Sequence, residues 1–200
     1  TGSAITYTIA VNQVPTAVTV TPSSSSICSN DLPVLLTLSG GTVNNVQAVL
    51  GTGTSVNGTT SYPSPLSNYY GGAKHQMLVR ASELTALGFV AGDQISAVQF
   101  NVNAVGSTFT GTLNNYSIAI GNTSNTVLNS TSFVSGLTTV RNAASVAVPT
   151  TGLPANLNIP FDAAFVWNGT SNIVIQTSYS NANSGTSTYF VQSRNSDPGF

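Results

Sequence analysis

The scarcity of charge is the feature that most constrains what this chain can become. Lys, Arg, Asp and Glu make up 4% of its 200 residues, whereas Ser, Thr, Asn and Gly together contribute 93. The surfaces of exposed helices are usually rich in Lys and Glu. Runs of Thr, Val, Ile and aromatic residues interrupted by Gly and Asn are typical of strands and turns. The composition favours an extracellular β-structure. It disfavours an enzyme, because few ionisable groups are available to meet in one cleft.

Hydrophobic alternation predicts the fold class. The hydrophobic share of 40% is enough for a packed core, so the low charge does not indicate disorder. Apolar residues alternate with polar ones in several short runs, separated by turn residues at roughly 8–12-residue spacing, which is typical of sandwiches. We therefore expect an all-β, antiparallel, jelly-roll-like β-sandwich. The strongest runs centre on Val98, Phe100 and Val102, on Tyr116, Ile118 and Ile120, and on Ile173, Ile175, Thr177 and Tyr179.

Weaker signals complete the secondary structure. Weaker strands are expected at residues 126–128, 133–134, 146–148 and 157–159, and a stronger one at residues 164–167. One helical turn is predicted over residues 82–87, with Ser82 as its N-cap, Glu83 against the N-terminal dipole and Gly88 closing it in the left-handed conformation.

The chain divides into three parts by pattern. Residues 1–12 alternate as a strand and are expected to be the terminal strand of a preceding domain. Residues 13–45, interrupted at Pro15, resemble a partial immunoglobulin-like segment or a linker, too short to bury a core alone. Residues 46–200 are expected to form the β-sandwich module. Both ends look cut from a longer polypeptide.

Several classes of function are disfavoured by what the sequence lacks. The four cations, Lys74, Arg80, Arg141 and Arg194, are too dispersed for a nucleic-acid surface. No apolar run approaches the roughly 20 residues of a membrane span, and one Cys and one His make zinc binding untenable. Cys28 is either a buried free thiol or half of a bridge to a partner outside this chain.

The few ionisable residues give weak catalytic signals. His75 is the one histidine, and we expect it at a strand end, bonded to backbone or water, with ligand contact as the alternative. Glycoside hydrolysis needs two carboxylates around a sugar, and Asp162 has no obvious mate. No cofactor is expected, although one Asp with carbonyl oxygens could hold calcium, at Asp93 or Asp162. The sequence predicts no catalytic residues.

Aromatic residues supply the candidate binding site. Sugars present C–H faces that stack on aromatic rings, so an aromatic cluster can form a carbohydrate platform, although such residues more often pack a sandwich core. Both interpretations stay open for the cluster, and for Trp167 we expect packing at a strand end. The cluster consists of Tyr62, Tyr69, Tyr70 and Trp167.

A set of motifs resembles one family. These motifs lie at residues 51–54, 62–63, 69–70, 72–78, 82–84 and 165–175. Through them, residues 48–195 resemble a β-sandwich module of large Bacteroidetes cell-surface adhesins, of the gliding-motility type and exported by type IX secretion. The stretch before it looks like the immunoglobulin-like segment that often precedes that module. The resemblance implies an extracellular, cell-surface location and transfers no catalytic residue.

The expected function is that of a structural or adhesive module. Such a module would extend a long secreted fibre, contact neighbouring modules of the same polypeptide, and touch a substratum or surface polysaccharide, in the resembling proteins during gliding motility. Two alternatives remain: a carbohydrate-binding module of a secreted multidomain enzyme, and a filament subunit whose strand at residues 1–12 completes a neighbour's sheet.

Overall fold

The computed structural model describes most of the sandwich region and short pieces of the part before it. The described residues are 7–12, 19–21, 37–39, 45–50, 55–56, 65–66, 71–106, 111–129, 131–180 and 190–194. Cys28 and the predicted platform residues Tyr62, Tyr69 and Tyr70 lie outside them.

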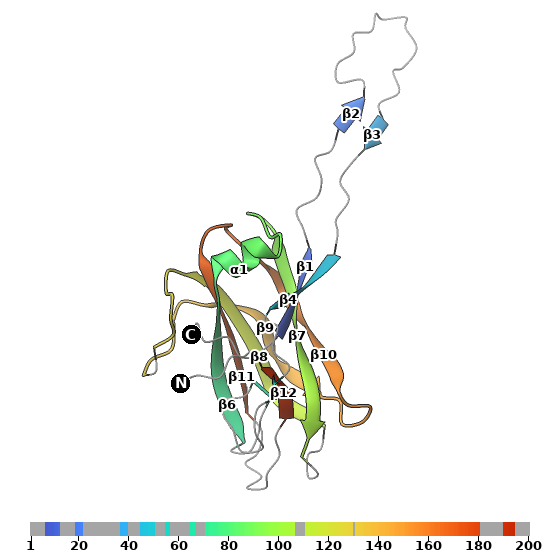
Figure 1. Ribbon diagram of the computed structural model, residues 1–200, viewed down its shortest axis with the longest axis vertical. Helices are drawn as coiled ribbons and strands as arrows, with labels where there is room; N and C mark the ends of the chain where they lie inside the picture. The colour runs from blue at the N-terminus through green and yellow to red at the C-terminus, as the bar shows by residue number, and fades with distance from the viewer. Residues whose placement is uncertain are drawn as a thin grey trace, which may run out of the picture.

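Strands dominate the described chain, as Figure 1 shows. One short helix, α1, spans Ala81–Ala86. The strands are β1 Tyr7–Asn12, β2 Thr19–Thr21, β3 Thr37–Ser39, β4 Asn45–Leu50, β5 Ser55–Val56, β6 Gly72–Val79, β7 Gln94–Val105, β8 Thr112–Thr123, β9 Thr138–Ala147, β10 Ala155–Val166, β11 Asn172–Ser180 and β12 Phe190–Arg194.

The first sheet is built around β7. Strand β10 pairs antiparallel along one edge of β7. Strand β1 pairs with the first half of the other edge, and β12 pairs with its last residues, so β1 and β12 follow each other along β7. Strands β4 and β5 add outside β1 and β12. The β10 register shifts between Pro160 and Phe165, since Pro160 has no N–H to give to the ladder.

The second sheet has four antiparallel strands in the order β6-β11-β8-β9. Its inner face packs on the first sheet, and the residues between the two sheets form the core. Each buried aliphatic or Phe side chain stabilises the fold by about 1.5–3 kcal/mol. The predicted antiparallel β-sandwich is confirmed. All the residues of the alternating runs named above are buried: Val98, Phe100, Val102, Tyr116, Ile118, Ile120, Ile173, Ile175, Thr177 and Tyr179.

The assignment to a preceding domain was wrong for residues 7–12, the described part of the segment 1–12. Strand β1 lies inside the sandwich, between β4 and β7, and Ile9 is fully buried in its core. The module therefore includes β1, and β4 begins at Asn45. Strands β2 and β3 lie between β1 and β4 in the sequence and pair with each other. In Figure 1 they stand away from the sandwich, so they are an insertion within one module.

The minor predictions had mixed outcomes. Residues 157–159 and 164–166 belong to one bulged strand, β10, which ends just before Trp167, and residues 126–128 and 133–134 form no strand. Helix α1 begins one residue before Ser82, and its N-cap is Arg80, whose N–H donates to Glu83 Oε2 at 2.7 Å. Gly88 closes the helix at φ +89° as expected.

Candidate functional site

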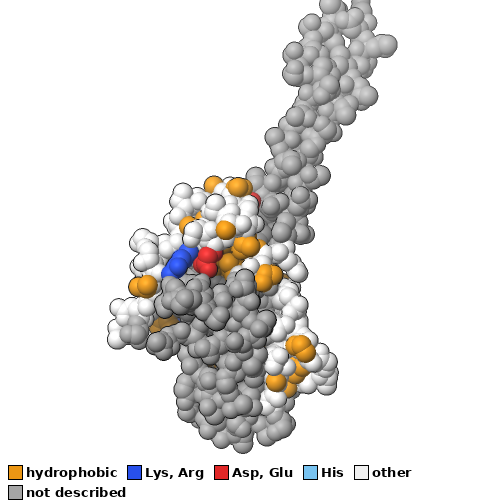
Figure 2. All heavy atoms as spheres, viewed as in Figure 1, with side chains coloured by type: hydrophobic (Ala, Val, Ile, Leu, Met, Phe, Trp, Pro, Cys, Tyr) orange, Lys and Arg blue, Asp and Glu red, His pale blue; other side chains and the backbone are white. Residues whose placement is uncertain are grey.

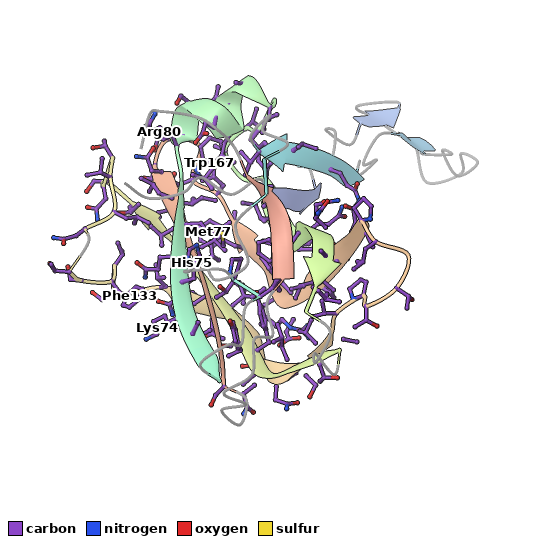
Figure 3. The ribbon with its side chains drawn as sticks, turned by 60° about the horizontal axis from the view of Figure 1, so that its bottom comes forward. Lys74, His75, Met77, Arg80, Phe133 and Trp167 are labelled. Carbon is purple, nitrogen blue, oxygen red and sulfur yellow. The ribbon has the colours of Figure 1, made fainter. Side chains whose placement is uncertain are left out.

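Trp167 is a core residue at the end of β10. Its side chain is 1% exposed, and its ring meets Phe89 edge-on, with centroids 6.4 Å apart and planes at 82°. Its Nε1 donates to the Ser171 carbonyl at 2.8 Å. Figure 3 places it under α1. The expected packing at a strand end is confirmed, and a ring so enclosed offers no face to a sugar.

The described carboxylates hold the backbone in place. Glu83 accepts the Arg80 N–H at the start of α1. Asp93 is buried and accepts the Val90 N–H at 3.0 Å, which fixes the turn after the helix. Asp162 accepts the N–H of Asn142 at 2.8 Å and its side-chain amide at 3.0 Å.

The two calcium candidates have these roles: Asp93 fixes a turn, and Asp162 on β10 bonds to Asn142 on β9. Within the described ranges, no three His, Cys, Asp or Glu residues come together as a possible metal site.

His75 lies inside the sandwich, which corrects the expectation of a strand end. It is the fourth residue of β6, is 9% exposed, and is the register partner of Thr177. Burial lowers its pKa to about 4, because desolvation disfavours the imidazolium form. The imidazole is therefore neutral at physiological pH.

Buried hydroxyls share this part of the interior. Tyr116 and Tyr179 stack with centroids 5.7 Å apart, and among the described residues their hydroxyls and that of Thr177 have no partner in hydrogen-bond geometry, although the Thr177 hydroxyl lies near that of Tyr116. Burial raises the pKa of both tyrosines well above the usual range, and the nearby Thr177 hydroxyl opposes this at Tyr116. These groups stay uncharged, so none of them is an acid or base poised near neutral pH.

The β8–β9 loop, residues 124–137, covers part of the outer face of the second sheet. Leu78 and Val174 point outward from their strands and yet are buried. Leu137 packs so closely on Gly121 that a Cβ there would lie 2.9 Å from its Cδ2. A small second core thus lies on the outside of the sheet.

Amide side chains anchor this loop. Gln76 Nε2 donates to the Val134 carbonyl at 2.8 Å, and Gln76 Oε1 accepts the Val134 N–H at 2.8 Å. Gln76 Nε2 also lies 3.0 Å from Gln176 Oε1 on β11. At the other end of the loop, Asn172 Nδ2 donates to the Asn125 carbonyl at 2.8 Å. A loop tied at both ends presents its side chains in a fixed position.

The loop carries the largest exposed aromatic side chain that the described residues offer. Phe133 is 56% exposed, and Lys74 Nζ lies 5.5 Å from its ring centroid. Figure 3 shows both at the outer side of β6, with His75 turned inward. The cation over the ring face is an attractive pair.

A row of polar residues continues from Lys74 across the sheet. Ser178 is the register partner of both Lys74 and Ser117. The two serine hydroxyls are 2.8 Å apart. Phe133, Lys74, Ser178, Ser117 and Gln176 define what we call the Lys74–Phe133 face.

The sequence did not point to this face. Residues 133–134 were predicted as a strand, and Lys74 was considered only as one of four dispersed cations. The usable signal was strand alternation in β6, which puts Lys74 and Gln76 on the face opposite to His75 and Met77.

Comparisons with known proteins add no relative. No protein-family model, curated protein or solved structure matches this chain. The resemblance to the adhesin module therefore stands on the motifs alone. Among the described residues, no helix has the length and hydropathy needed to cross a membrane.

Proposed function

We infer that this chain is a structural and adhesive module of a long secreted cell-surface protein. In that role it extends a fibre, abuts neighbouring modules of the same polypeptide, and contacts a substratum or polysaccharide. The adhesins that this chain resembles act in gliding motility, and a role in gliding motility is part of the proposal.

The use of the ionisable groups carries this inference. Glu83, Asp93 and Asp162 each accept a backbone N–H, and His75 is buried and neutral. Groups committed to turns and caps are poor proton carriers, because proton transfer would break the contacts they make. Few charged atoms show on the face drawn in Figure 2, where apolar atoms form scattered small patches. Such a surface suits modest contacts between modules.

The position of β1 favours a module over a strand-exchanging filament subunit. Strand β1 has neighbours on both edges within its own chain. Donating it to another subunit would remove Ile9 from the core and open the sheet between β4 and β7.

Surface retention tests the proposal. Beads coated with the chain are expected to adhere to polysaccharide-coated or cell-coated glass under flow, while beads coated with an unrelated β-sandwich wash off. Equal release of both bead types would contradict an adhesive role. A monomer in size-exclusion chromatography at rising concentration is also expected, and concentration-dependent filaments would favour strand addition.

A further inference from the structure

The Lys74–Phe133 face combines three chemistries that occur together in sugar recognition. An aromatic ring stands exposed beside an ammonium group, and hydroxyl and amide groups continue from them along the sheet. All are held by strands or by a loop tied to them. A site fixed before binding loses less conformational entropy when a ligand docks.

We propose that the Lys74–Phe133 face binds an acidic polysaccharide, one that contains uronic acid residues. The inference rests on the proposed adhesive function and names its ligand class and its site. The C–H face of a sugar ring packs on Phe133, the sugar carboxylate pairs with Lys74, and ring hydroxyls bond to the Ser178 and Gln176 side chains.

Charge is the reason for choosing an acidic polymer. The described carboxylates lie elsewhere: Glu83 is on α1, Asp93 is in the turn before β7, and Asp162 is in the bulge of β10. None of them neutralises Lys74, whose described partner is the Phe133 ring. A ligand carboxylate would give this ammonium a charge-assisted hydrogen bond, which is about twice as strong as a neutral one.

The polar row fits a polymer better than a single sugar. Lys74, Ser178 and Ser117 lie side by side on three neighbouring strands. Neighbouring strands are about 4.8 Å apart, so the row runs roughly 10 Å from β6 to β8. That length matches about two sugar residues laid across the sheet.

The test compares two forms of one polymer. Polygalacturonate and its fully methyl-esterified form are immobilised on separate biosensor surfaces, and the full chain is passed over both. The chain is expected to bind the acid form, to lose affinity with rising salt, and to bind the esterified form at least about tenfold more weakly.

Matched variants locate the site. Phe133→Ala and Lys74→Gln are expected to weaken binding about tenfold or more, while Lys74→Arg keeps the charge and retains binding. Val127→Ala is the control, because Val127 is 62% exposed on the same loop and lies outside the proposed contacts. Unfolding curves that match wild type exclude a folding defect, as expected for exposed side chains.

Two results would overturn the inference. One is no binding of the wild-type chain to polygalacturonate, and the other is wild-type affinity in both Phe133→Ala and Lys74→Gln. The bead assay tests the proposed function separately. Beads coated with wild-type chain that fail to adhere would contradict the adhesive function itself. Beads that adhere equally well with both variants would leave adhesion standing and exclude this face as its site.

Discussion

Replacing Trp167 with alanine should cause the largest loss of stability of any single aromatic truncation at the helix end of the sandwich. The ring is 1% exposed, so its removal leaves a cavity. Trp→Ala changes in cores cost about 3–5 kcal/mol. The edge-on contact with Phe89 and the bond from Nε1 to the Ser171 carbonyl place this site at the upper end of that range. Against a total stability of about 5–15 kcal/mol for an ordinary domain, the change removes a large part of the free energy of unfolding.

Urea denaturation followed by circular dichroism measures this loss. Fluorescence would not serve, because Trp167 is the one tryptophan of the chain. Trp167→Phe is the matched control: it keeps a ring beside Phe89 and loses the N–H donor, so a smaller loss of about 1–3 kcal/mol is expected. A change below about 1 kcal/mol in Trp167→Ala would refute the reasoning, since the ring would then not be a core anchor.

Three further predictions concern the interior and one turn. The free energy of unfolding should fall by up to about 3 kcal/mol in urea titrations as pH drops from 6.5 towards 4. Burial lowers the folded-state pKa of His75 to about 4, so the unfolded chain takes up the proton first. His75→Gln should flatten this pH dependence, and an unchanged slope would exclude His75 as its source. Thr177→Val should be neutral or stabilising by thermal melting, because the buried hydroxyl it removes has no partner in hydrogen-bond geometry among the described residues. A loss above about 1 kcal/mol would mean that this hydroxyl is bonded to the nearby Tyr116 hydroxyl in solution. Gly169→Ala should cost at least about 2 kcal/mol, since Gly169 has φ +82° and a Cβ there would lie 2.6 Å from the Ala91 Cβ; a variant that melts like wild type would contradict this turn geometry.

Strand alternation could be predicted from the sequence, because the side of the sheet to which a side chain points is set by its position along its own strand. Val98, Phe100 and Val102 recur with period two and all point into the core. The helix end was equally local, because Gly88 alone supplies the left-handed residue that closes α1. Where one residue type dictates a conformation, the prediction held.

Pairing between distant segments could not be read in this way. Strand β1 pairs with Gln94–Phe100 across more than eighty residues of chain, and no local pattern distinguishes that partner from one in another domain. The β8–β9 loop has the apolar content of strands, and yet its described residues form no strand and Leu137 packs on Gly121 at the outside of a sheet. Phe133 reaches Lys74 only through this loop, so the candidate face is a product of tertiary packing.

One measurement tests the central claim, that the chain works by binding through a rigid surface without chemistry on its ligand. Polygalacturonate is incubated with the chain and passed over a size-exclusion column with light-scattering detection. The account predicts that the protein co-elutes with the polymer and that the molar mass of the polymer stays constant over days. A polymer mass that falls with time, and that His75→Ala or Asp162→Ala restores, would contradict the account and assign the chain to hydrolysis.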